Sequence, residues 1–508
     1  MIGSLRRAFA AVALVVTLAT PAFAQDAPTA PTTPEGWRDL ALSDLAAARD
    51  VLTAQTPIPF DRDNPTYPAW LAEGYGQAEA RARDARDAAG HFYALALYLN
   101  GFNDPHIDVN PVANLSTAQW PGFIAASRNG GALVVMRDEN DADAPPIGAQ
   151  ILSCEGRTLA SLAEERLYPF VLNGRLALDR RRGVTRLFLE RSIPGAPAPS
   201  VCRIAVDGAE RDITLRWRAL PDPPESYWAA YQDASAGAAA SWGVSEPTPG
   251  VTWIGIPTFS SGSETAPQLE QLIRDINARG DAMRNGRAIV IDVRGNGGGN
   301  SAWADRIAIA IFGEAPVQRA NRVSSSSSGV DWRASPENIA YWREWLTSVA
   351  IPEFGANSEA VDFAEGAIQG MERALDRNPP LWRQGSPFVS RGGGLTQRRP
   401  RGEDAPFPAR VYLLSNGTCG SSCLNFADTV LFVPGVQLIG SATAGDGPYM
   451  EVRNVTLPSG LAVLTIPQKV WRGMGRGALE AYEPDIAYDG AWDDASVRAW
   501  TMGLIAAQ

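Results

Sequence analysis

The second half of the sequence predicts an α/β fold, because apolar strands alternate with helical patterns from Trp253 onward. The clearest unit is the apolar strand 288–292, which ends at a cluster of glycines and continues into the helical pattern 301–311. A second unit joins a strand at 410–414 through small polar residues to an apolar helix. Further strands are expected at 252–257, 438–440, 455–457 and 461–466, with a helix at 266–279.

The glycine cluster, residues 295 and 297–299, suggests a loop where backbone N–H groups approach a ligand or a reacting oxygen. An ordinary tight turn is the simpler alternative. A dinucleotide fingerprint would need a glycine where Asn300 stands, and a phosphate loop would need a lysine that is absent here. The pattern therefore disfavours nucleotide binding.

The N-terminus has the pattern of a secretory signal peptide, residues 1–24, with a basic start, an apolar run at 8–18 and a small-residue site. Cleavage is expected after Ala24, and the apolar run is too short to span a membrane. Gln25 does not indicate a lipoprotein. We expect a periplasmic or secreted protein without a membrane span.

Composition divides the remaining chain into four segments. Residues 25–36 are expected to form a disordered leader, 37–119 a helical cap, 120–220 a small β domain and 225–508 the α/β core. The β domain should contain a helix at 159–167 and strands at 132–136, 149–154, 186–190 and 213–217. Within it, residues 146–156 resemble the core of a PDZ domain, a fold that binds peptide ends at a sheet edge. Residues 323–360 and 391–404 are expected to be surface excursions.

The charged and sulfur-containing residues limit the possible functions. The net charge of −11 and the lack of a basic stripe argue against a nucleic-acid partner. Four cysteines allow three disulfide pairings; Cys154–Cys202 with Cys419–Cys423 is favoured because each pair lies within one predicted domain. Their spacing is wrong for a zinc site, so no metal is expected.

Four motifs occur in the order typical of one enzyme family. They are Ile291-Asp-Val-Arg-Gly-Asn-Gly-Gly298, Thr418-Cys-Gly-Ser-Ser-Cys423, Gly440-Ser-Ala-Thr-Ala-Gly445, and Leu457-Pro-Ser-Gly460 leading to Glu483-Pro-Asp-Ile486. Together they resemble the C-terminal-processing (tail-specific) serine peptidases and their tricorn-like relatives. The resemblance covers about residues 225–500. It implies a crotonase-like ββα-spiral core, a peptide or polypeptide substrate and no cofactor.

The resemblance also implies the catalytic residues. In one branch of the family a lysine follows the last glycine of the third motif, but Asp446 stands there, and the single lysine, Lys469, lies elsewhere. The tricorn-like branch uses a histidine and a glutamate. Its Asp-x-His turn resembles Asn103-Asp-Pro-His106, so His106 is the expected base; His91, in mid-helix, is expected to have a core or surface role.

Spacing from Gly445 implies that Ser421, rather than Ser422, is the nucleophile. The glutamate that holds the histidine is expected to be Glu480, with Glu483 as second choice. The oxyanion donors would be the N–H of Gly298 or Gly299 and that of Ser422.

Cys419 and Cys423 flank this serine and depart from the family pattern. Residues four apart on a helix have Cβ atoms about 5–6 Å apart, whereas a disulfide needs about 3.5–4.5 Å. If the two are bridged, Cys419 must precede the helix. Two alternatives to a peptidase remain open: a non-catalytic protein binding peptides or hydrophobic ligands on the same fold, and a crotonase-like acyl enzyme, which export disfavours.

Overall fold

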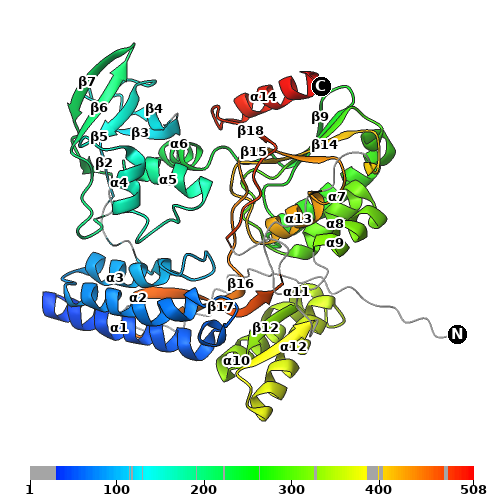
Figure 1. Ribbon diagram of the computed structural model, residues 1–508, viewed down its shortest axis with the longest axis horizontal. Coiled ribbons are helices and arrows are strands. Elements are labelled where there is room, and N and C mark those ends of the chain that lie inside the picture. Colours follow the sequence, from blue (N-terminus) through cyan, green and yellow to red (C-terminus); the bar gives the residue numbers. More distant parts are fainter. Residues whose placement is uncertain are drawn as a thin grey trace.

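The computed structural model describes residues 30–507, apart from residues 114, 116–117, 129, 190–191, 221–222, 263, 325–328, 386–398, 400–403 and 474–478. The expected signal peptide lies outside the described residues. No helix within the described part is both long enough and apolar enough to cross a membrane. Four units are visible in Figure 1: an N-terminal helical unit, a β-rich domain, an α/β core and a small helical unit around β12.

The N-terminal unit is helical, as its apolar periodicity predicts. Its helices are α1 (Pro34–Gln55), α2 (Thr66–Arg83) and α3 (Ala88–Asn100). The side chains of Thr33 and Asp87 cap α1 and α3 by accepting backbone N–H bonds. Since α1 begins at Pro34, the last residues of the expected leader belong to this helix.

The β-rich domain is a five-stranded antiparallel sheet with two helices packed on it. In sheet order its elements are β3 (Phe123–Arg128), β4 (Gly131–Arg137), β5 (Gln150–Cys154), β6 (Val201–Val206) and β7 (Ala209–Thr214), with helices α4 (Leu159–Arg166) and α5 (Ala177–Arg186). Cys154 and Cys202 are opposite each other on β5 and β6 and form a disulfide.

The strand expected at 186–190 is wrong. Arg186 ends α5, and Leu187–Leu189 form a turn that is hydrogen-bonded back to the helix. The apolar residues Val184, Leu187 and Phe188 follow helical rather than alternating spacing, and they are buried in the domain core.

The α/β core contains a six-stranded sheet with the order β18-β15-β14-β11-β10-β9, parallel except for β9. Its strands are β9 (Gly243–Thr248), β10 (Val251–Gly255), β11 (Ala288–Asp292), β14 (Arg410–Ser415), β15 (Val436–Gly440) and β18 (Ile486–Ala487). Helices α7 (Thr265–Arg284), α8 (Ser301–Phe312), α9 (Glu314–Ser324) and α13 (Ser422–Val430) cover one face, and α14 (Asp494–Ala507) packs on the other (Figure 1).

The register of the two central strands positions the candidate site. Strands β11 and β14 are parallel neighbours, with Asp292 opposite Leu414. Their carboxyl ends therefore meet at the same edge of the sheet. The glycine loop that follows β11 and the serine turn that follows β14 both begin at this edge, where open α/β sheets commonly bind ligands.

A second sheet connects the helical units. It has the order β1-β17-β12-β13, with β16 also paired to β17. Its members are β1 (Asp108–Pro111), β12 (Gly329–Arg333), β13 (Leu381–Gly385), β16 (Tyr449–Thr456) and β17 (Ala462–Arg472). Figure 1 shows β16 and β17 crossing from the N-terminal helices to the unit around β12.

The expectation that 323–360 is a surface excursion is wrong. From Gly329 onward this segment forms β12, α10 (Pro336–Trp345), a π-helix (Leu346–Ala350) and α11 (Ile351–Phe354). These elements pack with α12 (Glu359–Arg377) around their own core. Trp332, Trp342 and Trp345 are nearly fully buried there. The tryptophans, which made the segment look unusual, pack into the core of this unit.

Candidate active site

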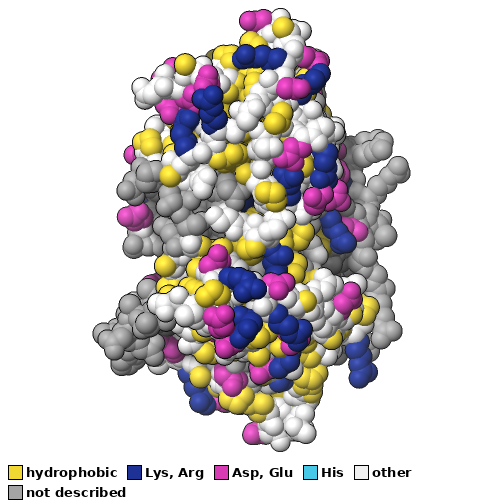
Figure 2. Space-filling model, turned by 90° about the vertical axis from the view of Figure 1, so that its left-hand side faces the viewer, with side chains coloured by type: hydrophobic (Ala, Val, Ile, Leu, Met, Phe, Trp, Pro, Cys, Tyr) yellow, Lys and Arg dark blue, Asp and Glu magenta, His cyan; other side chains and the backbone are white. Residues whose placement is uncertain are grey.

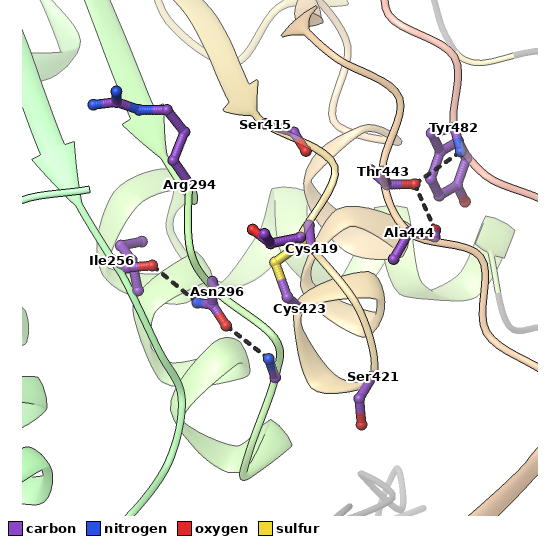
Figure 3. The surroundings of a disulfide bond; sticks show 12 residues. Ile256, Arg294, Asn296, Ser415, Cys419, Ser421, Cys423, Thr443, Ala444 and Tyr482 are labelled. Atoms are coloured by element: carbon purple, nitrogen blue, oxygen red, sulfur yellow. Dashed lines mark hydrogen bonds between the residues drawn. A yellow bond between two sulfur atoms is a disulfide. The ribbon is translucent and has the colours of Figure 1, made fainter. Parts of the chain in front are cut away.

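Ser421 occupies the turn between β14 and α13 in an unusual backbone conformation. It is the N-cap residue of α13, with φ 49° and ψ −124°, and its side chain makes no capping hydrogen bond. A positive φ is uncommon for a residue with a Cβ, and such strain concentrates at functional sites. In Figure 3 the Ser421 side chain points away from the neighbouring disulfide. The turn thus presents a hydroxyl at the N-terminus of a helix.

The disulfide Cys419–Cys423 spans this turn. Both cysteines are fully buried, with Cα atoms 5.1 Å apart. Because α13 begins at Ser422, Cys419 precedes the helix, as the distance argument requires. The Cys423 N–H also donates to the Gly420 carbonyl at 2.9 Å. Ser421 therefore lies in the short stretch of chain that the disulfide closes into a covalent ring.

Gly298 packs directly against the serine turn. A Cβ on this glycine would lie 2.8 Å from Ser421 Cβ and 2.9 Å from Ser422 N, so only glycine allows this approach. The hydroxyl of Ser422 donates to the Gly299 carbonyl at 2.6 Å. The two loops predicted to form one site are thus in contact.

The amide of Gly298 has a partner within its own loop. It donates to Asn296 Oδ1 at 2.9 Å, while Asn296 Nδ2 donates to the Ile256 carbonyl at 2.9 Å (Figure 3). This amide cannot bind an oxyanion while that bond persists. The other expected donors are the amides of Gly299 and Ser422.

The charged residues of the first motif support the loop from behind. Arg294 is fully buried and contacts Asp292 and Asp494, each at 2.7 Å. Asp292 also accepts a hydrogen bond from Trp253 Nε1 at 3.1 Å. Figure 3 shows Arg294 directed away from Ser421. The Asp–Arg pair therefore anchors the glycine loop to the core and does not face the reacting serine.

His106 lies largely buried in the turn between α3 and β1. Its Nδ1 atom is 3.3 Å from Asp104 Oδ1, an ion-pair distance without the alignment of a good hydrogen bond. The backbone N–H of His106 donates to the same oxygen, Asp104 Oδ1, at 3.0 Å. On the other side, the Tyr67 hydroxyl donates to Asp104 Oδ2 at 3.3 Å. The histidine ring thus faces a carboxylate that is held from both sides.

The local charges set the protonation of His106. Burial is the largest single effect and lowers the pKa of His106, whereas the adjacent Asp104 carboxylate and the charges of Asp446 and Glu451 together raise it by more. The pKa is therefore raised above its ordinary value of 6.5.

Asp446 and Gly447 connect the histidine turn to the serine turn. The Ser421 N–H donates to the Asp446 carboxylate, the group that stands where a dyad lysine would be. Next to it, Gly447 packs on Asp104 so closely that a Cβ would lie 1.5 Å from Asp104 Oδ2. The serine turn and the histidine turn are therefore linked through Asp446, Gly447 and Asp104.

The two expected glutamates lie at the surface. Glu480 and Glu483 are both exposed, and between them Tyr482 donates its N–H to Thr443 Oγ1 at 2.9 Å. The carboxylate beside the His106 ring is Asp104. Sequence reasoning gave Asp104 no role, although its position two residues before the histidine in a turn is a usable signal.

The remaining histidine and the single lysine have structural partners. His91 Nε2 lies 2.9 Å from Asp44 Oδ2 in the buried packing of α3 on α1. Lys469 is buried 3.0 Å from Glu451 and lies over the Trp332 ring at 4.7 Å. Among the described residues, no group of three or more His, Cys, Asp or Glu side chains could hold a metal ion.

Comparison with known proteins gives one family match and several structural matches. Residues 250–488 match the model of peptidase family S41. Among solved structures, mature CPAF complexed with lactacystin is 16% identical with a TM-score of 0.59, covering 93% of this chain and 99% of that one. Another crystal structure of mature CPAF is 16% identical with a TM-score of 0.57, covering 89% and 92%. These two matches show a shared fold.

A third match, the photosystem II D1 C-terminal processing protease, is 12% identical and covers 89% of this chain and 93% of that one. Its TM-score is 0.29. No curated protein sequence matches the chain.

The matched family and the serine turn define a serine-type peptidase. Within that class, residues 250–488 match the domain of peptidase family S41, the C-terminal-processing peptidases.

Proposed function

We propose that the protein is an exported endopeptidase that hydrolyses peptide bonds with Ser421 as nucleophile and His106 as base. The observation that carries this proposal is the backbone of Ser421, held at positive φ at a helix N-terminus against Gly298. Such a conformation is costly, and a binding site has no evident use for it, whereas a nucleophile must project its oxygen from the turn.

The chemistry follows from the protonation of His106. With Nδ1 facing Asp104, the Nε2 atom is available to take the Ser421 proton as the hydroxyl attacks the carbonyl carbon. The imidazolium then returns this proton to the leaving amine. The N-terminus of α13, with the amides of Gly299 and Ser422, would stabilise the oxyanion.

We propose Asp104 as the carboxylate that orients His106, with Glu480 as the alternative. The 3.3 Å contact of Asp104 with the ring supports this choice. Apo hydrogen bonds in active sites are often long and tighten when substrate binds, so the imperfect alignment does not argue against it.

Export is supported by the two disulfides, Cys154–Cys202 and Cys419–Cys423, because such bonds persist in oxidising compartments. We propose that residues 1–24 are removed on the way to the periplasm or the medium. We further propose that the β-rich domain acts in a PDZ-like way on the peptide substrate and that the core is crotonase-like.

The test is hydrolysis of casein by the purified protein and by two neighbouring serine variants. Ser421→Ala should lose hydrolysis by about 10⁴-fold or more, as removal of a triad nucleophile does. The matched control, Ser422→Ala, keeps its backbone N–H and should retain most of the activity. Full hydrolysis by Ser421→Ala would contradict the proposal.

A further inference from the structure

A cavity of about 440 Å³ lies beside the histidine turn. It is bounded by α3, by the segment 103–111 and by residues 170–186 of the β-rich domain. Asp104, Pro105 and Ile107, which surround His106 in the chain, are among its walls. Its volume lies within the range of about 300–1,000 Å³ that is typical of ligand pockets. The cavity therefore lies beside the chain segment that carries the proposed base.

The cavity runs along the edge of strand β1. All four residues of β1, Asp108–Pro111, line it. Since consecutive side chains of a strand point to opposite faces, a cavity that touches four in a row must follow the edge of the strand. Among the described strands, β1 pairs only with β17 and ends the sheet order on this side.

The register shows which backbone groups point to this edge. Val112 N–H donates to the Leu461 carbonyl at 2.9 Å, continuing the β1–β17 register in which Pro111 is opposite Ala462. Hydrogen-bonded pairs alternate along an antiparallel ladder. Val109 and Pro111 therefore direct their carbonyls away from β17 and toward the cavity.

The Val109 amide points the same way, where it can donate to an incoming backbone carbonyl. Pro111, which has no N–H to donate, stands at an outward position where the β1–β17 ladder loses nothing. The edge thus offers one donor and two acceptors at strand spacing.

Part of the cavity wall is apolar. It is lined by Phe92, Tyr93 and Ala96 of α3 and by Phe170, Val171 and Leu172 of the β-rich domain. Tyr93 and Phe170 are in edge-to-face contact, with ring centroids 6.0 Å apart. The cavity is also lined by the charged residues Asp179, Arg182 and Arg186. A large apolar side chain would be buried among the apolar residues.

We propose that the substrate polypeptide binds in extended form along the free edge of β1, pairing its backbone with Val109 and Pro111 and placing a large apolar side chain in the cavity against α3. The inference rests on the proposed peptidase function and names the substrate class of that site: unfolded segments with apolar side chains. A strand added at this edge passes His106, which is where a scissile bond must lie.

One test fills the cavity. A library of quenched-fluorescent decapeptides, with one position fixed as Leu, Phe, Tyr, Asp or Lys, should be cleaved best with Leu, Phe or Tyr. Ala96→Trp should lower kcat/KM for the best peptide by at least about tenfold, because the indole occupies the cavity. Ala80→Trp on the exposed face of α2 is the matched control and should cleave like wild type.

Labelling of Ser421 by a fluorophosphonate, a small probe, separates this inference from the proposed function. A wild-type protein that is not labelled would overturn the peptidase proposal itself. If Ala96→Trp loses far less of its labelling rate than of its kcat/KM for the peptide, the result supports binding of the substrate in the cavity along β1. Wild-type kcat/KM in the folded Ala96→Trp variant overturns it.

A second measurement uses the unaltered protein. Methylating the backbone nitrogens of the best peptide one at a time should impair cleavage at every second position on the β1 side, about fivefold or more for each lost hydrogen bond. Alternation supports pairing with β1. Equal effects at adjacent positions, or none, would contradict it.

Discussion

Removing the Cys419–Cys423 bridge should slow the reaction of Ser421, whereas removing the Cys154–Cys202 bridge should lower only the stability of the fold. The bridge closes a sequence separation of 4, for which the chain-entropy model gives about 2 kcal/mol of constraint. Holding Ser421 at φ 49° costs of the order of 1–3 kcal/mol. The free energy of the disulfide constraint is similar to the strain of the Ser421 backbone. Without the disulfide, in Cys419→Ala/Cys423→Ala, the turn should therefore relax to an unstrained conformation. The reactive population then falls about ten- to thirtyfold.

The assay is the rate of fluorophosphonate labelling of Ser421, measured beside the free energy of unfolding in urea. The matched control is Cys154→Ala/Cys202→Ala, which removes the other bridge, in the β-rich domain. The control should lose stability and keep its labelling rate while folded. A wild-type labelling rate in Cys419→Ala/Cys423→Ala would refute the role given to the bridge.

Three further outcomes are expected. Hydrolysis should rise with pH as His106 loses its proton, with a midpoint above 6.5; Asp104→Asn removes the charge that raises this pKa, so a pH–rate profile should show a lower midpoint and a reduced maximum. Tyr67→Phe should lower kcat about fivefold with little change in KM, because Asp104 loses one of its hydrogen bonds; an unchanged kcat would argue against Asp104 as orienter. Lys469→Met should lower the free energy of unfolding by about 3–5 kcal/mol, because the buried Glu451 carboxylate loses its ion pair with Lys469, and Lys469→Met/Glu451→Gln should recover part of it; peptidase activity that disappears in folded Lys469→Met would instead point to a lysine base.

The sequence predicted the loops of the site because glycine and serine patterns are local. The strand-to-helix junctions after β11 and β14 follow from apolar runs that end in small residues, and their meeting follows from parallel strand pairing. The contact of Gly298 with Ser421 is a consequence of that geometry. The disulfide argument, which required Cys419 to precede the helix, also depended only on local distances.

The surroundings of His106 were not predictable in the same way. Tyr67, Asp104 and Asp446 come from three separate segments, and only tertiary packing brings them together. The prediction of a surface excursion at the tryptophan-rich segment failed for a related reason. Trp332 is buried by α10 and α12, and neither helix carries a sequence motif. Apolar side chains in a segment without clear periodicity do not reveal which partners will cover them.

The most direct test of the catalytic claim is to label the intact protein with a fluorophosphonate and map the modified residue by mass spectrometry, in wild type and in His106→Ala. We expect a single label on Ser421 whose rate falls by at least about a hundredfold in His106→Ala, since the base is lost. A label on Ser422, or an unchanged rate in the histidine variant, would contradict it.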